Sequence, residues 1–183
     1  GIQEFIIAPL KGHEFYRAAR NVGGEFIQIS PASKNCINIM EIRKVDNSVN
    51  ELLDGPTLDA SALAGKIQRL HIFFSLLIPD MSHEEKQLLD EALIKTYARK
   101  GITHKNESLT DPQHPEQYKK MPILEDVYNV LLESEDTKRL AHILNRLVHG
   151  SASSFNQQTN VDLTNKYTVL DISELTGSSD LLT

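Results

Sequence analysis

The stretch from Gly23 to Ile42 (GGEFIQISPASKNCINIMEI) constrains the fold of this chain more than any other. Its glycines precede a short apolar run at residues 25–29, which is typical of a buried β-strand. Ser30-Pro31 ends this strand, because proline extends the residue before it and lacks the amide hydrogen that a sheet requires. The stretch therefore predicts a glycine turn, a strand and a proline turn, as in α/β domains, and a second, mostly apolar segment follows with two asparagines.

A strand and a short helix are predicted before this stretch. Glu4 to Ala8 (EFIIA) is almost wholly apolar, as in a strand that is covered on both faces of a parallel sheet, and Pro9 follows it. His13 to Asn21 can form a short helix that the two glycines would end. A strand, a helix and a strand within roughly thirty residues predict a βαβ unit with a right-handed crossover.

The middle of the chain is predicted to be helical. Ser61 to Ile78 is so apolar that its helix should be mostly buried. Ser82 to Glu85 forms a capping box, and the helix that begins there should stop at Gly101. Two further helices are expected, one from Pro122 to about Glu133 and one from a cap at residues 134–136 to Gly150. These four helices predict a helical subdomain.

Polar segments separate these elements. Residues 43–60 are expected to form a loop. Residues 102–121 hold two prolines and two histidines, and a structureless loop of this length is expected to be mobile or functional. After polar residues 151–160, Tyr167 to Ile172 (YTVLDI) predicts a third strand. The expected domains are a first βαβ part at residues 1–45, an inserted helical subdomain at 46–150 and a return to the sheet at 151–183.

Composition and charge exclude some classes of protein. A chain of 183 residues with 40% hydrophobic and 24% charged residues fits one soluble domain, or one domain with an insertion. Its net charge of -6 argues against a protein wrapped in nucleic acid. The single Cys36 excludes an internal disulfide and fits a reducing compartment. The longest apolar run, Leu70 to Ile78, is far shorter than the ~20 residues of a membrane span, and no signal peptide is visible.

The sequence contains no phosphate-binding loop, dinucleotide fingerprint, nucleophile elbow or Cys/His metal spacing. Asp90-Glu91 has the letters of an acidic pair at a strand end, but it lies inside a capped helix, where a solvated face is expected. Glu14 is the candidate catalytic carboxylate, because it follows the first strand at the edge where α/β sheets bind ligands. Its alternative role is that of a first-turn glutamate favoured by the helix dipole.

Other polar residues have less specific roles. His71 is expected to be a satisfied histidine in the core or at a subdomain interface, and His142 and His149 are expected at the surface or an interface. Asp171 ends the third strand at the same sheet edge as the residues after the first strand, but one aspartate indicates no reaction. The loop at residues 155–160 (FNQQTN) is either a set of turns or a contact loop.

Four stretches occur in an order that resembles a known family. They are FIIAPLKGHEF, VGGEFIQISPASKNCINIMEI, FNQQTNVDL and YTVLDISEL. Together they resemble the conjugation ATPases of type IV secretion systems, the TraC-like and TraE-like members of the HerA/FtsK superfamily, in the form found in Gram-positive conjugative elements. The resemblance implies an α/β fold: a partial RecA-like parallel sheet of about three strands with an inserted helical subdomain of about four helices.

The resemblance also implies an activity and its limits. The intact protein would use ATP and Mg²⁺, associate with itself and with secretion components, and act in the cytoplasm, peripherally at the membrane. Ala8 stands where the family has an aspartate before proline, which puts a metal or water contact there in doubt, and Glu14-Phe15 matches a Glu-aromatic pair. The Walker A lysine, the Walker B pair and the arginine finger have no counterpart, so we expect a piece of a longer protein that does not hydrolyse ATP or hold a cofactor by itself.

Two other hypotheses follow from the residues. One is a helical interaction module that contacts neighbouring subunits or secretion partners, which the buried helix and the long loop motivate. The other is DNA binding during transfer, for which the phosphate contacts would come from Lys34, Arg43, Lys44, Arg99, Lys100 and Lys105. The net acidity weighs against DNA binding.

Overall fold

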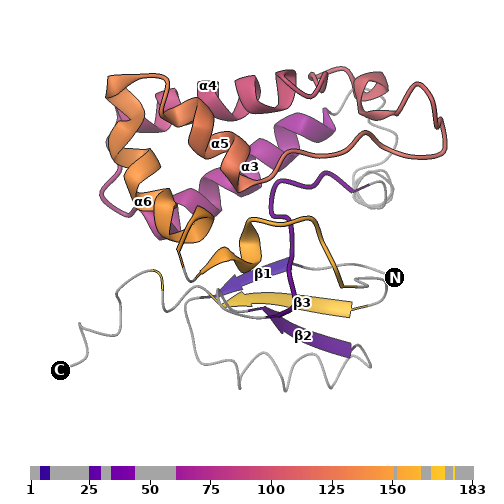
Figure 1. Ribbon diagram of the computed structural model, residues 1–183, viewed down its shortest axis with the longest axis horizontal. Helices are drawn as coiled ribbons and strands as arrows, with labels where there is room; N and C mark the ends of the chain where they lie inside the picture. The colour runs from indigo at the N-terminus through magenta and orange to yellow at the C-terminus, as the bar shows by residue number, and fades with distance from the viewer. Residues whose placement is uncertain are drawn as a thin grey trace.

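The computed structural model of the chain describes residues 5–8, 25–29, 34–43, 61–150, 152–161, 166–171 and 175. Within these residues, a block of helices lies over a small sheet (Figure 1). The helices are α3 (Ala62–Leu77), α4 (His83–Ala98), α5 (Leu124–Leu131) and α6 (Lys138–Val148), and the strands are β1 (Phe5–Ala8), β2 (Glu25–Ile29) and β3 (Lys166–Asp171). Short 3₁₀ helices are η1 (Asn106–Leu109), η2 (Glu135–Thr137) and η3 (Ser153–Phe155).

The sheet is small and parallel. Its order is β1-β3-β2, so β3 lies between the other two strands. Ala8 pairs with Asp171 and Ile29 pairs with Leu170, which brings the carboxyl ends of all three strands to one edge. The three strand positions agree with those expected from the sequence to within one residue.

The expected fold class, an α/β domain built on a RecA-like sheet, is nevertheless wrong, because the described part of the chain is mostly helical. Helices α3 and α4 have 16 residues each, whereas the strands have four, five and six. The side chain of Ile29 in β2 belongs to the described core. Strands this short cannot enclose a core, so the amphipathic helices bury their apolar faces against one another instead.

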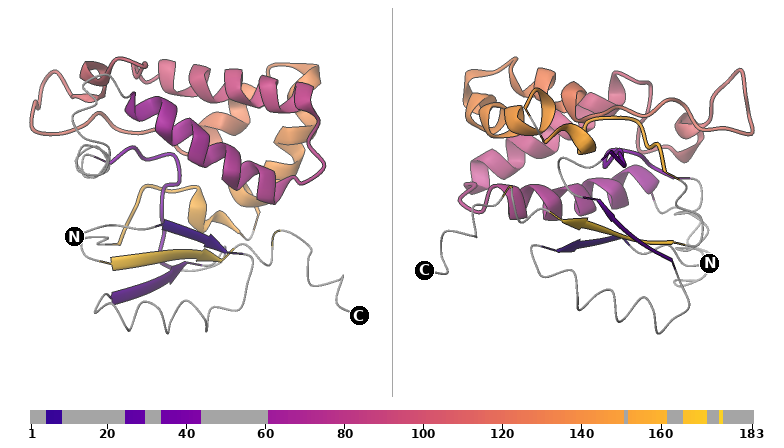
Figure 2. Two further views of the ribbon diagram at one scale, coloured as in Figure 1. Left: turned by 180° about the vertical axis from the view of Figure 1, so that it is seen from behind. Right: turned by 60° about the horizontal axis from the view of Figure 1, so that its bottom comes forward.

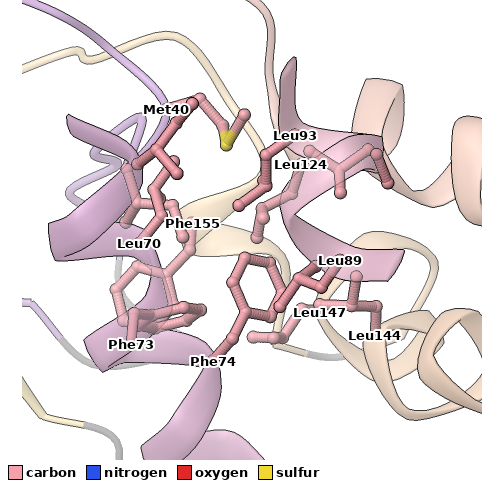
Figure 3. Close-up of a cluster of buried hydrophobic side chains, with 14 of the residues drawn as sticks. Met40, Leu70, Phe73, Phe74, Leu89, Leu93, Leu124, Leu144, Leu147 and Phe155 are labelled. Atoms are coloured by element: carbon pink, nitrogen blue, oxygen red, sulfur yellow. The ribbon is translucent and has the colours of Figure 1, made fainter. Parts of the chain in front are cut away.

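The helical core gathers side chains from all four helices and from η3 (Figure 3). Phe73 and Phe74 of α3 meet edge to face with ring centres 5.5 Å apart, and Phe73 meets Phe155 at 6.4 Å. As expected, α3 is largely buried, although Ile72 is 58% exposed. Leu89 and Leu93 of α4 are fully buried beside it. This packing holds the four helices and η3 together as one helical block.

The helix termini follow the expected signals, with one correction. The Ser82 hydroxyl accepts a hydrogen bond from the Glu85 amide at 3.1 Å, and the Glu85 carboxylate accepts one from the Ser82 amide, which confirms the capping box. Gly101 ends α4 at a φ of 75°, in the left-handed region that glycine tolerates. Helix α5 begins after Pro122 and not on it, because the Asp126 carboxylate accepts from the Ile123 amide at 2.8 Å and fixes a later start.

The loop expected at residues 102–121 is an ordered arm, which corrects the expectation of a structureless segment. Thr110 and Tyr118 form an antiparallel bridge, and the Asp111 and Gln117 backbones are joined at 2.9 Å. Leu109 is buried at the root of the arm, whereas residues 112–117 at its tip are exposed. Figure 2 shows the arm extending away from the helices in both views. The arm is therefore ordered by local hydrogen bonds, although its sequence lacks the regular spacing of apolar residues that marks a buried helix or strand.

Candidate functional site

Two connectors join the strands to the helical block and lie against each other. Residues 34–43 follow β2, and residues 152–161 precede β3. The Ile37 amide donates to the Ser154 carbonyl and the Asn160 amide donates to the Cys36 carbonyl, both at 3.1 Å. We call residues 36–41 and 156–160 the latch.

Asn38 lies at the centre of the latch and is 2% exposed. Its side-chain nitrogen donates to the Pro122 carbonyl at 2.8 Å and to the Gln158 side-chain oxygen at 3.2 Å. Its side-chain oxygen accepts from the Met40 amide at 3.1 Å. A buried amide needs such partners, because an unpaired polar group in the interior is destabilising.

Thr159 and Asn160 bind the opposite connector. The Thr159 hydroxyl accepts from the Asn38 amide at 3.1 Å and donates to the Glu41 carboxylate at 2.8 Å. The Asn160 side chain accepts from the Cys36 amide at 2.6 Å and donates to the Lys34 carbonyl at 3.1 Å. The loop at residues 155–160 is therefore a contact loop within the chain.

The latch is also tied to the helices. The Asn156 side chain accepts from the Glu125 amide at the start of α5 and donates to the Val148 carbonyl at the end of α6. The Gln158 side chain donates to the Met121 carbonyl at 3.0 Å. On the other connector, the Met40 carbonyl accepts from the hydroxyl of Tyr97 in α4, and burial raises the pKa of that phenol.

An open polar hollow lies between the latch and the arm. Its volume is about 410 Å³. Its walls bring together carboxylates, ammonium groups and a guanidinium, and they consist of Glu41, Ile42, Arg43, Glu116, Gln117, Tyr118, Lys119, Lys120, Met121 and Gln158. This mixture of charges suits polar contacts with a partner, but it does not favour a partner of one particular charge.

The sheet edge expected to bind a ligand is only partly described. Asp171 is the last residue of β3 and pairs with Ala8, the last residue of β1. Glu14, the candidate catalytic residue, lies outside the described residues, as do the helix expected at residues 13–21 and most of the loop expected at 43–60. Its proposed position beside the Ala8–Asp171 edge therefore stays a prediction.

His71, His142, His149 and the acidic pair lie on or beside the helices, and some of these residues have a partner. His71 on α3 is bonded to Asp90 on α4 at 2.8 Å. Asp90 and Glu91 lie inside α4 and not at a strand end, as the sequence indicates. His149 is exposed and its ring meets that of Tyr128 at 5.2 Å. His142 is exposed as well.

The six basic residues considered for DNA contact have different surroundings. Arg99 is ion-paired with Glu133, whose pKa is lowered by its hydrogen bonds with Lys95 and Arg99. Arg43 lines the hollow, and Lys44 lies outside the described residues. The other three, Lys34, Lys100 and Lys105, are exposed.

Binding of ATP with Mg²⁺ requires a loop that holds the phosphates and side chains that hold the metal. The sequence lacks the Gly-rich loop that would cradle phosphates. Among the described residues, no group of three or more His, Cys, Asp or Glu side chains could hold a metal ion. No helix in this part of the chain is long and apolar enough to cross a membrane.

The buried latch and the helical block can be compared with solved proteins. No protein-family model and no curated protein sequence matches the chain. Among solved structures, VirB4 of Thermoanaerobacter pseudethanolicus matches it with 26% sequence identity and a TM-score of 0.60. The chain is similar to VirB4. The likeness covers 93% of this chain and 60% of the VirB4 chain, so the chain spans about 60% of that relative's length.

Sequence reasoning missed the residues that hold the connectors together. In the sequence, Asn38 is one of two asparagines in an apolar segment and Tyr97 is one residue within a predicted helix, so neither is predicted to bond to a distant segment. The useful signal was the polar side chain inside an otherwise buried segment, since such a group must find partners. Its partner loop lies about 120 residues away, and no local pattern identifies it.

Proposed function

We propose that this chain is part of a VirB4-like ATPase of a type IV secretion system. The similarity to VirB4 over 93% of the chain, at 26% identity, carries this proposal. The four sequence stretches that resemble conjugation ATPases point to the same class independently. A match in both fold and motif order is stronger support than either one alone, because one fold can serve many functions.

The intact protein would couple ATP hydrolysis to transport. In this proposal it binds ATP with Mg²⁺, associates with itself, and acts with secretion components at the cytoplasmic face of the membrane. The groups that hold the phosphates and the metal would be supplied by other parts of the intact protein. In this proposal the chain contributes a helical subdomain with its connectors, and Glu14 would lie near the nucleotide.

The experiment compares the intact coding frame with the 183-residue chain. Phosphate release from Mg-ATP should be measurable for the intact protein and absent for the chain, and it should be lost when the Walker A lysine of the intact protein is changed to alanine. ATP hydrolysis by the purified chain alone would overturn its proposed non-catalytic role. A coding frame without a phosphate-binding loop on either side would overturn the ATPase assignment.

A second candidate function is that of an interaction module. The observation that favours it is the ordered arm at residues 102–121, whose tip is exposed while its root is anchored in the block. Such a module would retain purified secretion components on an affinity resin, with and without ATP. Retention that is lost when residues 112–116 are replaced by a short turn, with folding unchanged, would support this function. Retention unaffected by that replacement would count against the arm.

A further inference from the structure

The latch joins the two segments through which the helical block is attached to the strands. One segment leaves β2 and the other enters β3, and these two strands are paired side by side. We infer that the latch holds the two connectors to each other and to the helical block, so that the block and both connectors open only as one cooperative unit. This inference concerns the resting chain and does not depend on the proposed ATPase function.

The first argument is the bonding between the connectors. Five hydrogen bonds join residues 36–38 to residues 154–160 through backbone amides or the Asn38 side chain. Thr159 adds a bond to Glu41 further along the same connector. Separating the connectors would remove Gln158 from the Asn38 side chain and Thr159 from the Asn38 amide, and it would leave both donors short of a partner at a residue that is 2% exposed.

The second argument is that each connector is bonded to the block. In the connector after β2, the Met40 carbonyl accepts a hydrogen bond from the Tyr97 hydroxyl of α4. The Asn38 side chain of the same connector donates one to the Pro122 carbonyl. The connector before β3 holds the start of α5 and the end of α6 through one side chain, Asn156. A swing of the block away from either connector would therefore expose unpaired groups at several helices at once.

The third argument is burial. Residues 36–40 are all buried, and Ile37, Ile39 and Met40 belong to the same hydrophobic core as α3 and α4. Figure 3 shows Met40 directed toward the leucines of the helices. A segment that shares its core with the block cannot act as a free hinge, because motion at it would open that core.

Hydrogen exchange of single amides tests this inference on the chain as it stands. The amides of Cys36, Asn38 and Asn160 should exchange as slowly as those in the middle of α4. Exchange at these three amides that is at least about 100-fold faster than in α4 would show that the latch opens alone, and would overturn the inference.

A matched pair of variants sharpens the test. Thr159→Val keeps the side-chain shape but removes the acceptor for the Asn38 amide and the donor to Glu41. Exchange of the latch amides and of the α4 amides should rise by the same factor. A faster exchange of the latch amides without faster exchange of the α4 amides would refute the inference that the latch and the block open as one unit. Thr103→Val, the same change at an exposed site in the arm, should leave both sets of amides unchanged.

Discussion

The side-chain nitrogen of Asn38 donates a hydrogen bond to the carbonyl oxygen of Pro122 at 2.8 Å, although 84 residues separate them. The bond connects the segment after β2 to the residue before the first turn of α5. Both residues are buried, so water cannot replace either partner. The contribution of such a buried hydrogen bond to stability is clearest when one partner is removed, because the other partner is then left unsatisfied in the interior.

Asn38→Ala should lower the free energy of unfolding by about 2–6 kcal/mol, because it leaves the Pro122 carbonyl and the Met40 amide without their partner at about 1–3 kcal/mol each. Denaturant unfolding followed by circular dichroism measures this change. Asn129→Ala makes the same substitution at an exposed site of α5 and should change stability by less than about 0.5 kcal/mol. Equal losses in the two variants would contradict the role of Asn38.

Tyr97→Phe should change the alkaline stability of the chain. Burial raises the pKa of Tyr97 above its ordinary value of 10.0, so the folded state retains the phenol proton that the unfolded state loses. Stability from this group is therefore full below pH about 10 and falls above it. In Tyr97→Phe this part of the alkaline decline should be absent, and at neutral pH the lost bond to Met40 should cost about 1 kcal/mol. Unfolding measured from pH 8 to about 11 tests both effects; an unchanged alkaline slope would refute the assignment.

Glu85→Gln should weaken the junction between α4 and α6. Arg139 binds both Glu85 oxygens at 2.8 and 2.7 Å and reaches Asp80, and its hydrogen bonds hold the Glu85 pKa below the ordinary value of 4.5. The depressed pKa means that stabilisation is full above pH 4.5 and fades as the pH falls through the folded-state value. The variant keeps a side chain suited to the capping box, so a loss of about 1 kcal/mol at pH 7 would report the ion pair.

The control for that junction is Glu84→Gln. Glu84 lies in the same first turn of α4 and is exposed, so it shares the helix dipole without the partner Arg139. Its substitution should change stability by less than about 0.5 kcal/mol at pH 7. The stabilities of Glu85→Gln and the native chain should converge in acid. A difference that stays constant as the pH falls well below 4.5 would argue against the ion pair as its source.

Two Gly→Ala variants should have opposite effects. Gly101 has a φ of 75°, and alanine in that region costs about 1 kcal/mol or more. Gly65 lies within α3, and a Cβ there would meet no atom within 4 Å, so alanine should stabilise the helix by up to about 1 kcal/mol. Thermal unfolding of the two variants measures the sign directly. A stabilising Gly101→Ala would show that α4 does not end in the left-handed conformation.

The sequence predicts elements well where a local rule applies. The capping box at Ser82 and the stop at Gly101 depend on residues within one helical turn, and both are present. The strands are also placed correctly, since short apolar runs have few alternatives and a proline marks the end of both β1 and β2. The balance between sheet and helices was misjudged, because the strand–helix–strand pattern was given more weight than the lengths of the elements, and the resemblance to a known family strengthened the same expectation.

The features that were missed depend on distant partners or on polar loops. The arm has no periodicity, and its order comes from turns such as that at Asp111, whose side chain accepts from the Gln113 amide. The start of α5 was placed at Pro122 because proline favours a first helical position, but Asp126 fixes a later start. The latch pairs residues that lie far apart in sequence, so no window of sequence contains both halves.

Cys36 and Asn160 are bonded to each other although 124 residues separate them. When the two ends of an inserted segment lie next to each other, the length of the segment has little effect on the distance between the parts of the chain before and after it. The residues between these two positions therefore behave as a cassette. A host sheet could exchange this cassette for another with a different surface while its own strands kept their register, so the block can diversify faster than the scaffold that carries it.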